Sequence, residues 1–290
     1  MRLPPLAKTF RAGVVSLVAL LPACARAEGI DTEHLFGFMI GADVGNLGER
    51  EFQSDTTGSF GKNGGRYRAI GQEFELEFVP MRNLRVEVGS TFVSHLISGV
   101  PGLDDQRRLS WQGASLDLRY RFLDRETAPF GLTFATELHA RRVDEMTAEA
   151  VRGFGTEFRL AFDRELVPDR IIAAFNLIYE PEWTRLVGSG VMERESTAGA
   201  ALGVMAQLRP GFLLGGEARY LRKYEGAGLE ELAGQALFVG PTAYFQLSKR
   251  SRLTASWSVQ AWGRPAGTVA SMDLVNFERH QARLVFGINF

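Results

Sequence analysis

The stretch Gln72-Glu73-Phe74-Glu75-Leu76-Glu77-Phe78 alternates acidic and apolar side chains. In a β-strand its two phenylalanines and its leucine would lie on one face, and its three glutamates on the other. A helix would not separate them, because neighbours on a helix surface recur three and four residues apart. The stretch therefore predicts a strand with one apolar face and one acidic face.

The same alternation recurs along the chain in about twelve segments of roughly ten residues. Short connectors, such as Pro80–Asn83, alternate with longer ones, such as Asn46–Gly65. This rhythm is typical of an antiparallel up-and-down β-barrel, with short turns at one end and long loops at the other. The sequence thus predicts an all-β transmembrane barrel of about twelve strands. We expect strands at 38–44, 72–78, 84–89, 115–122, 130–141, 157–163, 171–180, 202–208, 214–220, 239–247, 253–260 and 281–290.

The N-terminus has the features of a secretory signal peptide. Basic residues precede the apolar run Ala12–Leu21, and Ala25–Ala27 supplies a small-x-small cleavage site. We expect residues 1–27 to be removed and residues 28–290 to form a single barrel domain. Leu21–Cys24 also resembles a bacterial lipobox, which leaves lipidation of Cys24 as an alternative.

The C-terminus carries a second signal. Apolar side chains occupy every second position back from an aromatic last residue: Leu284, Phe286, Ile288 and Phe290. This pattern resembles the C-terminal assembly signal of bacterial outer-membrane β-barrel proteins. The resemblance covers the mature chain at the level of class and singles out no subfamily. It implies the outer membrane of a Gram-negative cell, contact with its lipid, and insertion by the barrel-assembly machinery.

Composition excludes several classes of protein. A formal net charge of -1 argues against nucleic-acid binding, and one cysteine forms no internal disulfide. No long apolar run follows the signal, so a helical membrane protein is excluded. Glu137 and His139 would supply only two metal ligands, so we expect neither a metal site nor a cofactor. A soluble β-sandwich is the remaining alternative fold.

The inward face of the predicted barrel is strongly charged. Twelve strands close into a cylinder of about 12 Å radius, and inward side chains leave a gap of roughly 7 Å radius. Only Glu28 to about Glu33 precedes the expected first strand, so nothing is expected to fill the gap. If Phe78 pairs with Leu84, Glu77 faces Arg85. The residues expected to line a constriction are Glu73, Glu75, Glu77, Arg85, Glu87, Asp117, Arg119, Arg121, Glu137, His139, Arg141, Glu157 and Arg159.

These features favour a narrow, porin-like channel that transports a small polar solute. An alternative is a closed structural barrel whose loops serve envelope integrity, adhesion or assembly of a partner. A lipid hydrolase comes third, because no G-x-S-x-G motif occurs and Ser94 is not expected beside His280. We therefore assign no catalytic residue, and the sequence assigns neither the solute nor the oligomeric state.

Overall fold

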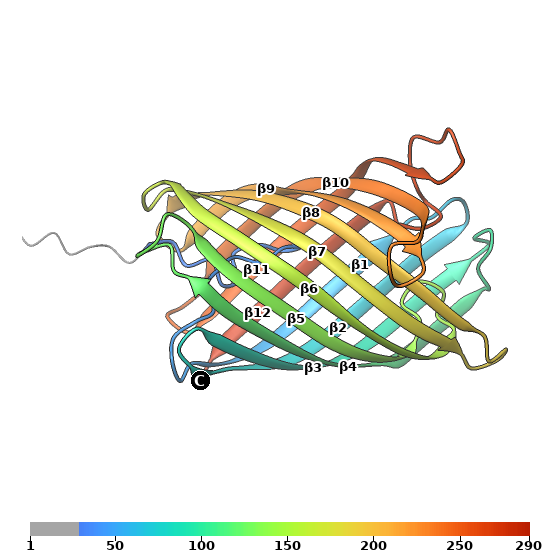
Figure 1. The fold of residues 1–290 in the computed structure, drawn as a ribbon, viewed down its shortest axis with the longest axis horizontal. Helices are drawn as coiled ribbons and strands as arrows, with labels where there is room; N and C mark the ends of the chain where they lie inside the picture. The colour runs from blue at the N-terminus through green and yellow to red at the C-terminus, as the bar shows by residue number, and fades with distance from the viewer. Residues whose placement is uncertain (1–28) are drawn as a thin grey trace, which may run out of the picture.

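Residues 29–290, as described by a computed structural model, form a closed barrel of antiparallel strands (Figure 1). Each strand pairs with its neighbours in sequence, and β1 pairs with β12 to close the sheet. The prediction of an all-β, up-and-down barrel with twelve strands is confirmed. The strands are β1 (Arg50–Phe60), β2 (Arg66–Met81), β3 (Leu84–Ser98), β4 (Gln106–Leu123), β5 (Gly131–Val143), β6 (Ala150–Val167), β7 (Ile171–Leu186), β8 (Met192–Arg209), β9 (Phe212–Glu225), β10 (Glu231–Gln246), β11 (Ser251–Pro265) and β12 (His280–Asn289).

The two ends of the barrel differ in their connections. At the turn end, which also holds the C-terminus, the connections are residues 82–83, 124–130, 168–170, 210–211 and 247–250. At the loop end they are residues 61–65, 99–105, 144–149, 187–191, 226–230 and 266–279.

Most connections at the loop end are shorter than the sequence predicts, because the strands continue beyond their apolar alternation. β4, β6 and β8 each contain 18 residues, whereas about 9–11 cross a bilayer. The first residues of β8, Met192–Ser196, are largely polar yet remain in the ladder. A strand end that faces water needs no apolar side chains, so hydrophobicity did not predict where it stops.

The outer face of the barrel is apolar and the inner face is polar. Phe74, Leu76 and Phe78 point outward and are 42%, 51% and 38% exposed, whereas Glu77 points inward and is 2% exposed. An apolar outer face of this kind is stable in hydrocarbon rather than in water. Among the residues that the structure describes, no helix is long and apolar enough to span a bilayer.

The predicted position of the first strand is wrong. The sequence pattern places residues 50–60 in the long connector Asn46–Gly65. The first strand lies at Arg50–Phe60 and not at 38–44. Its outward face includes Ser54 and Thr56, and Thr56 Oγ1 donates a hydrogen bond of 2.6 Å to Gln72 Oε1 on β2. Because Ser54 and Thr56 interrupt the outward face between Phe52 and Phe60, apolar alternation does not identify this strand.

Residues 29–45, which we call the inner segment, lie inside the barrel near the turn end (Figure 1). This finding corrects the expectation that nothing fills the lumen. Leu35, Phe36 and Met39 belong to an apolar cluster with Ile172 of β7 and Met205 of β8. The inward apolar side chains of this wall are therefore the surface on which the inner segment packs.

Candidate functional site

The inner segment is held by wall side chains instead of a β-ladder. Asn176 of β7 accepts a hydrogen bond from Ile40 N and donates one to Ile40 O, both at 2.9 Å. Glu217 of β9 accepts hydrogen bonds from Gly37 N at 2.7 Å and Phe38 N at 2.9 Å. Buried backbone groups are costly without partners, so these side chains allow an irregular segment to be buried.

A second set of contacts fixes the segment close to the turn end. Asp163 of β6 accepts hydrogen bonds from Thr32 Oγ1 at 2.5 Å and Ala42 N at 2.8 Å. Arg125, in the turn between β4 and β5, contacts Asp163 at 3.2 Å and Asp43 at 2.6 Å. Two parts of the segment are thus tied to the same wall carboxylate.

Gly203 of β8 allows the segment to approach closely. A Cβ atom at this position would lie 2.6 Å from Phe36 Cε1 and 2.7 Å from the Met39 sulfur. Those distances are shorter than van der Waals contact, so any larger residue would push against the inner segment.

The other side of the segment faces a buried charge network on β2, β3 and β4. Arg85 is 1% exposed, and its Nη1 lies 3.0 Å from Glu33 Oε1 of the inner segment. Its Nε lies 3.4 Å from Glu77 Oε2, and its Nη2 contacts Glu87. Arg119 Nη2 lies 3.2 Å from Glu87 Oε2, so its positive charge also balances that carboxylate.

The predicted register between β2 and β3 is wrong. A bulge between Phe78 and Met81 pairs Met81 with Leu84, so that Glu77 faces Glu87 directly. Arg85 nevertheless reaches both glutamates because its long side chain extends along the strand. The bulge adds residues that no alternation pattern predicts.

The residues predicted to line a constriction all face the interior. Most line a cavity of about 90 Å³ against the inner segment: Glu73, Glu75, Arg85, Glu87, Asp117, Arg119, Glu137, Glu157 and Arg159. Glu77 borders this cavity through its contact with Arg85, and Arg121 pairs with Asp43 at 3.3 Å closer to the turn end. His139 and Arg141 line a separate cavity of about 190 Å³. Their role in a constriction remains a prediction.

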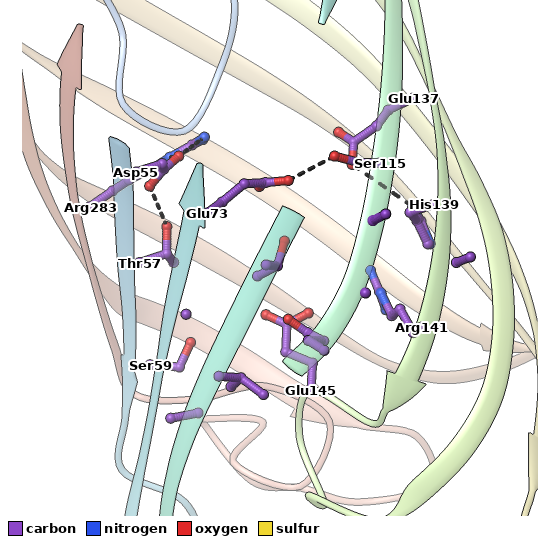
Figure 2. A pocket seen from close by; sticks show the side chains of 18 residues that line it. Asp55, Thr57, Ser59, Glu73, Ser115, Glu137, His139, Arg141, Glu145 and Arg283 are labelled. Carbon is purple, nitrogen blue, oxygen red and sulfur yellow. Dashed lines mark hydrogen bonds and ion pairs between the residues drawn. The ribbon is translucent and has the colours of Figure 1, made fainter. Parts of the chain in front are cut away.

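Three cavities follow one another inside the barrel. The outermost, about 560 Å³, lies at the loop end and shares Ser59, Arg141 and Glu145 with the cavity of about 190 Å³. That cavity shares Glu73, Glu137 and Arg283 with the one of about 90 Å³ at the inner segment. Figure 2 shows the middle cavity, in which Glu73 of β2 reaches Ser115 of β4 at 2.8 Å. The three polar cavities, called the passage below, thus lie in series from the loop end to the inner segment.

Acidic residues dominate this passage. Six acidic residues, four of which line its cavities, lie directly opposite one another on successive strands from β1 to β6: Glu51, Glu77, Glu87, Asp117, Glu137 and Glu157. Like charges in this arrangement destabilise a sheet unless cations compensate them. The outermost cavity has two basic residues, Arg141 and Lys223, against eight acidic ones: Asp144, Glu145, Glu149, Glu180, Glu182, Glu193, Glu195 and Glu278.

Burial shifts the pKa of two groups in loops at this end. Lys62 lies 3.3 Å from the Val275 carbonyl oxygen, with its Nζ 5.4 Å from the centre of the Tyr67 ring, and burial lowers its pKa to about 8. Burial also raises the pKa of Glu145 above its ordinary value. Both shifts follow from the withdrawal of these side chains from water.

Three of the four histidine rings in the described part of the chain have hydrogen-bond partners, and none of these is serine. His95 Nε2 lies 2.7 Å from the Glu145 carbonyl oxygen, and His139 Nε2 lies 3.1 Å from Glu182 Oε1. His280 Nδ1 accepts a hydrogen bond of 3.4 Å from Trp257. The sequence identified the inward direction of His95 and His139, but not their partners.

Solved structures resemble this barrel. The COG4313 outer membrane channel from Pseudomonas putida F1 has a TM-score of 0.59 and 13% identity, covering 86% of this chain and 98% of that one. The NanC porin has a TM-score of 0.49 and 9% identity, covering 82% of this chain and 100% of the porin chain. The shared feature is the fold. No curated protein matches the chain in sequence. The model of a family of unknown function (DUF6662) matches residues 28–290, and the chain belongs to that family.

Proposed function

We propose that this protein is an outer-membrane channel with a narrow, cation-preferring path for small polar solutes. The observation that carries this proposal is the acidic passage of three cavities that ends at the inner segment. The segment packs on β7 and β8 through apolar side chains, which leaves its charged side towards β2–β4. The path therefore runs along this charged side, where Arg85, Glu87 and Arg119 border it.

An outer-membrane location is supported by the apolar outer face and by the C-terminal residues. We infer that residues 1–27 direct export, although they lie outside the described residues. We also infer that Leu284, Phe286, Ile288 and Phe290 are read by the assembly machinery. Phe290 is 69% exposed at the turn end, so it is accessible before the barrel closes.

We expect Phe290→Ala to lower the amount of folded barrel in the outer membrane, because the terminal aromatic ring of the signal is removed. Cell fractionation followed by a heat-modifiability gel measures the folded fraction. Phe130→Ala, which removes an outward ring at the turn end, is the matched control. Equal losses for both variants would contradict a signal role for Phe290.

Ion selectivity tests the channel proposal. Glu182 and Glu195 face each other across β7 and β8, and pair with Arg141 at 2.5 Å and Lys223 at 2.8 Å. In a planar bilayer with a KCl gradient, the unmodified protein should prefer K⁺. The double variant Glu182→Gln and Glu195→Gln removes two of the acidic groups of the outermost cavity and leaves Lys223 without its ion-pair partner, so the reversal potential should move towards anion preference.

Glu126→Gln is the control for this measurement, since Glu126 is exposed in a turn at the other end. It should leave the reversal potential unchanged. An unmodified protein that prefers chloride, or a double variant with unaltered selectivity, would contradict the proposed path.

The second candidate is a closed barrel that presents its loops for adhesion, envelope integrity or assembly of a partner. One observation favours it: the side chains of Glu33, Glu77, Arg85 and Glu87 are only 1–3% exposed, in a network joined to the inner segment. A correctly folded barrel that never conducts would favour this candidate over the channel. A lipid hydrolase has less support, because no histidine among the described residues forms a hydrogen bond with a serine.

A further inference from the structure

His34 of the inner segment is surrounded by carboxylates. Its side chain is 10% exposed, and its Nε2 lies 3.5 Å from Glu77 Oε2, 3.6 Å from Glu51 Oε1 and 3.8 Å from Glu33 Oε2. Within the described part of the chain, neither ring nitrogen of His34 makes a hydrogen bond. A buried imidazole therefore points into three acidic groups without bonding to any of them.

These separations suit a metal ion better than hydrogen bonds. Hydrogen bonds from a ring nitrogen to oxygen span about 2.7–3.2 Å. Zinc lies about 2.0–2.2 Å from histidine nitrogen and carboxylate oxygen, which places tetrahedral ligand atoms about 3.4 Å apart. One ligand atom each from Glu33, His34 and Glu77 lies within 4.8 Å of the others. A small inward movement of these side chains would complete the coordination.

The local charge also calls for a cation. Four carboxylates lie here, those of Glu33, Glu51, Glu77 and Glu87. Among the described residues, the guanidinium groups that pair with these carboxylates alone are those of Arg85 and Arg252. Arg119 contacts Glu87 but also lies 2.9 Å from Asp117, whose charge it balances. With all four carboxylates ionised, the buried network is short of two positive charges, which one divalent ion or the protonation of two carboxylates would supply.

Space for the ion lies beside the ring. The cavity of about 90 Å³ is bordered by Glu33 and His34. Its neighbours towards the loop end are the two other polar cavities, with which it lies in series. The group of ligands therefore borders polar space on the side that faces the loop end.

The other cluster of this kind, His139 with Glu180 and Glu182, differs in the decisive respect. His139 Nε2 already lies at hydrogen-bond distance from Glu182, and Arg141 Nη1 is 2.5 Å from the same carboxylate. Both clusters have guanidinium groups beside their carboxylates, but the His139 ring already has a hydrogen-bond partner, whereas the His34 ring has none among the described residues. It therefore serves as a control.

We propose that Glu33, His34 and Glu77, with Glu51 beside them, bind one divalent transition-metal ion of the zinc type. Two ligands belong to the inner segment and the others to β1 and β2, so the ion joins the segment to the wall. This inference goes beyond the channel function and does not depend on conduction.

The test uses the full mature chain, folded in detergent and treated with a chelator. Zn²⁺ is added, excess metal is removed by dialysis, and bound zinc is measured by elemental analysis, with affinity from calorimetry. We expect one ion per chain. His34→Gln and Glu77→Gln should each weaken binding by about tenfold or more, and His139→Gln should leave it unchanged.

Two results would overturn the site: a folded protein that retains no zinc, or His34→Gln that binds as tightly as the unmodified chain. Heat-modifiability gels establish that each variant is folded. If a variant fails to fold, the visible spectrum of Co²⁺ added to the unmodified protein tests the site instead. An intense visible spectrum typical of tetrahedral cobalt supports the site, and the weak spectrum of octahedral cobalt contradicts it.

Discussion

Deletion of residues 30–42 is expected to raise the single-channel conductance by about fivefold or more. Without the inner segment, the twelve-stranded barrel has a lumen of roughly 7 Å radius, compared with roughly 3 Å for a path one hydrated ion wide. Conductance follows cross-sectional area, so the increase is large. Selectivity should weaken as well, because Glu33 is lost and the remaining charges stand further from the ions.

A single substitution tests the same idea without shortening the chain. Gly203→Ala places a methyl group within 2.6–2.7 Å of Phe36 and Met39, which should displace the inner segment and raise conductance to a lesser extent. Gly71→Ala is the matched control, since its Cβ would meet only the Thr57 carbonyl oxygen at 3.8 Å. If the deletion and Gly203→Ala both conduct like the unmodified protein, the inner segment does not limit the path.

Arg85→Met is expected to destabilise the folded barrel by about 3–5 kcal/mol, the usual cost of removing one partner from a buried ion network. The substitution leaves Glu33, Glu77 and Glu87 without their shared guanidinium at 1–3% exposure. Urea unfolding of the protein in detergent or lipid vesicles, followed by tryptophan fluorescence, measures the change. The inner segment should also lose its ion pair with β3, which joins Glu33 to Arg85.

Arg185→Met is the control, because Arg185 is exposed on β7 and should change stability by less than about 0.5 kcal/mol. A second variant combines Arg85→Met with Glu87→Gln, which removes one of the three carboxylates that contact Arg85 and should recover part of the loss. Equal stability of Arg85→Met and Arg185→Met would show that the network contributes nothing to folding.

The strand pattern was predictable from sequence wherever one face meets hydrocarbon. Phe74, Leu76 and Phe78 alternate with glutamates because the two faces of β2 have different surroundings. That rule fails for β1, whose outward face mixes polar and aromatic side chains, and for the inner segment, which is buried among wall side chains on all sides. Phe38 and Met39 are both buried, so the segment has no exposed face to distinguish.

The interior position of the charged residues was predictable from alternation, but their partners were not. The bulge after Phe78 changes which glutamate faces which, and side-chain alternation does not reveal a bulge. His34 meets Glu51 and Glu77 only because the inner segment returns into the barrel. The available signals were Ile172 and Ile178, apolar residues on the polar face of β7, and both belong to the apolar cluster of the inner segment.

The most direct test of the proposed function is single-channel recording of the full mature protein, folded and inserted into a planar bilayer, at two salt concentrations. Small discrete steps, with a reversal potential that shows cation preference, are the predicted result. The contrary result is a protein that a heat-modifiability gel shows to be folded, that inserts into the bilayer, and that never conducts. That result would favour the closed barrel that presents its loops.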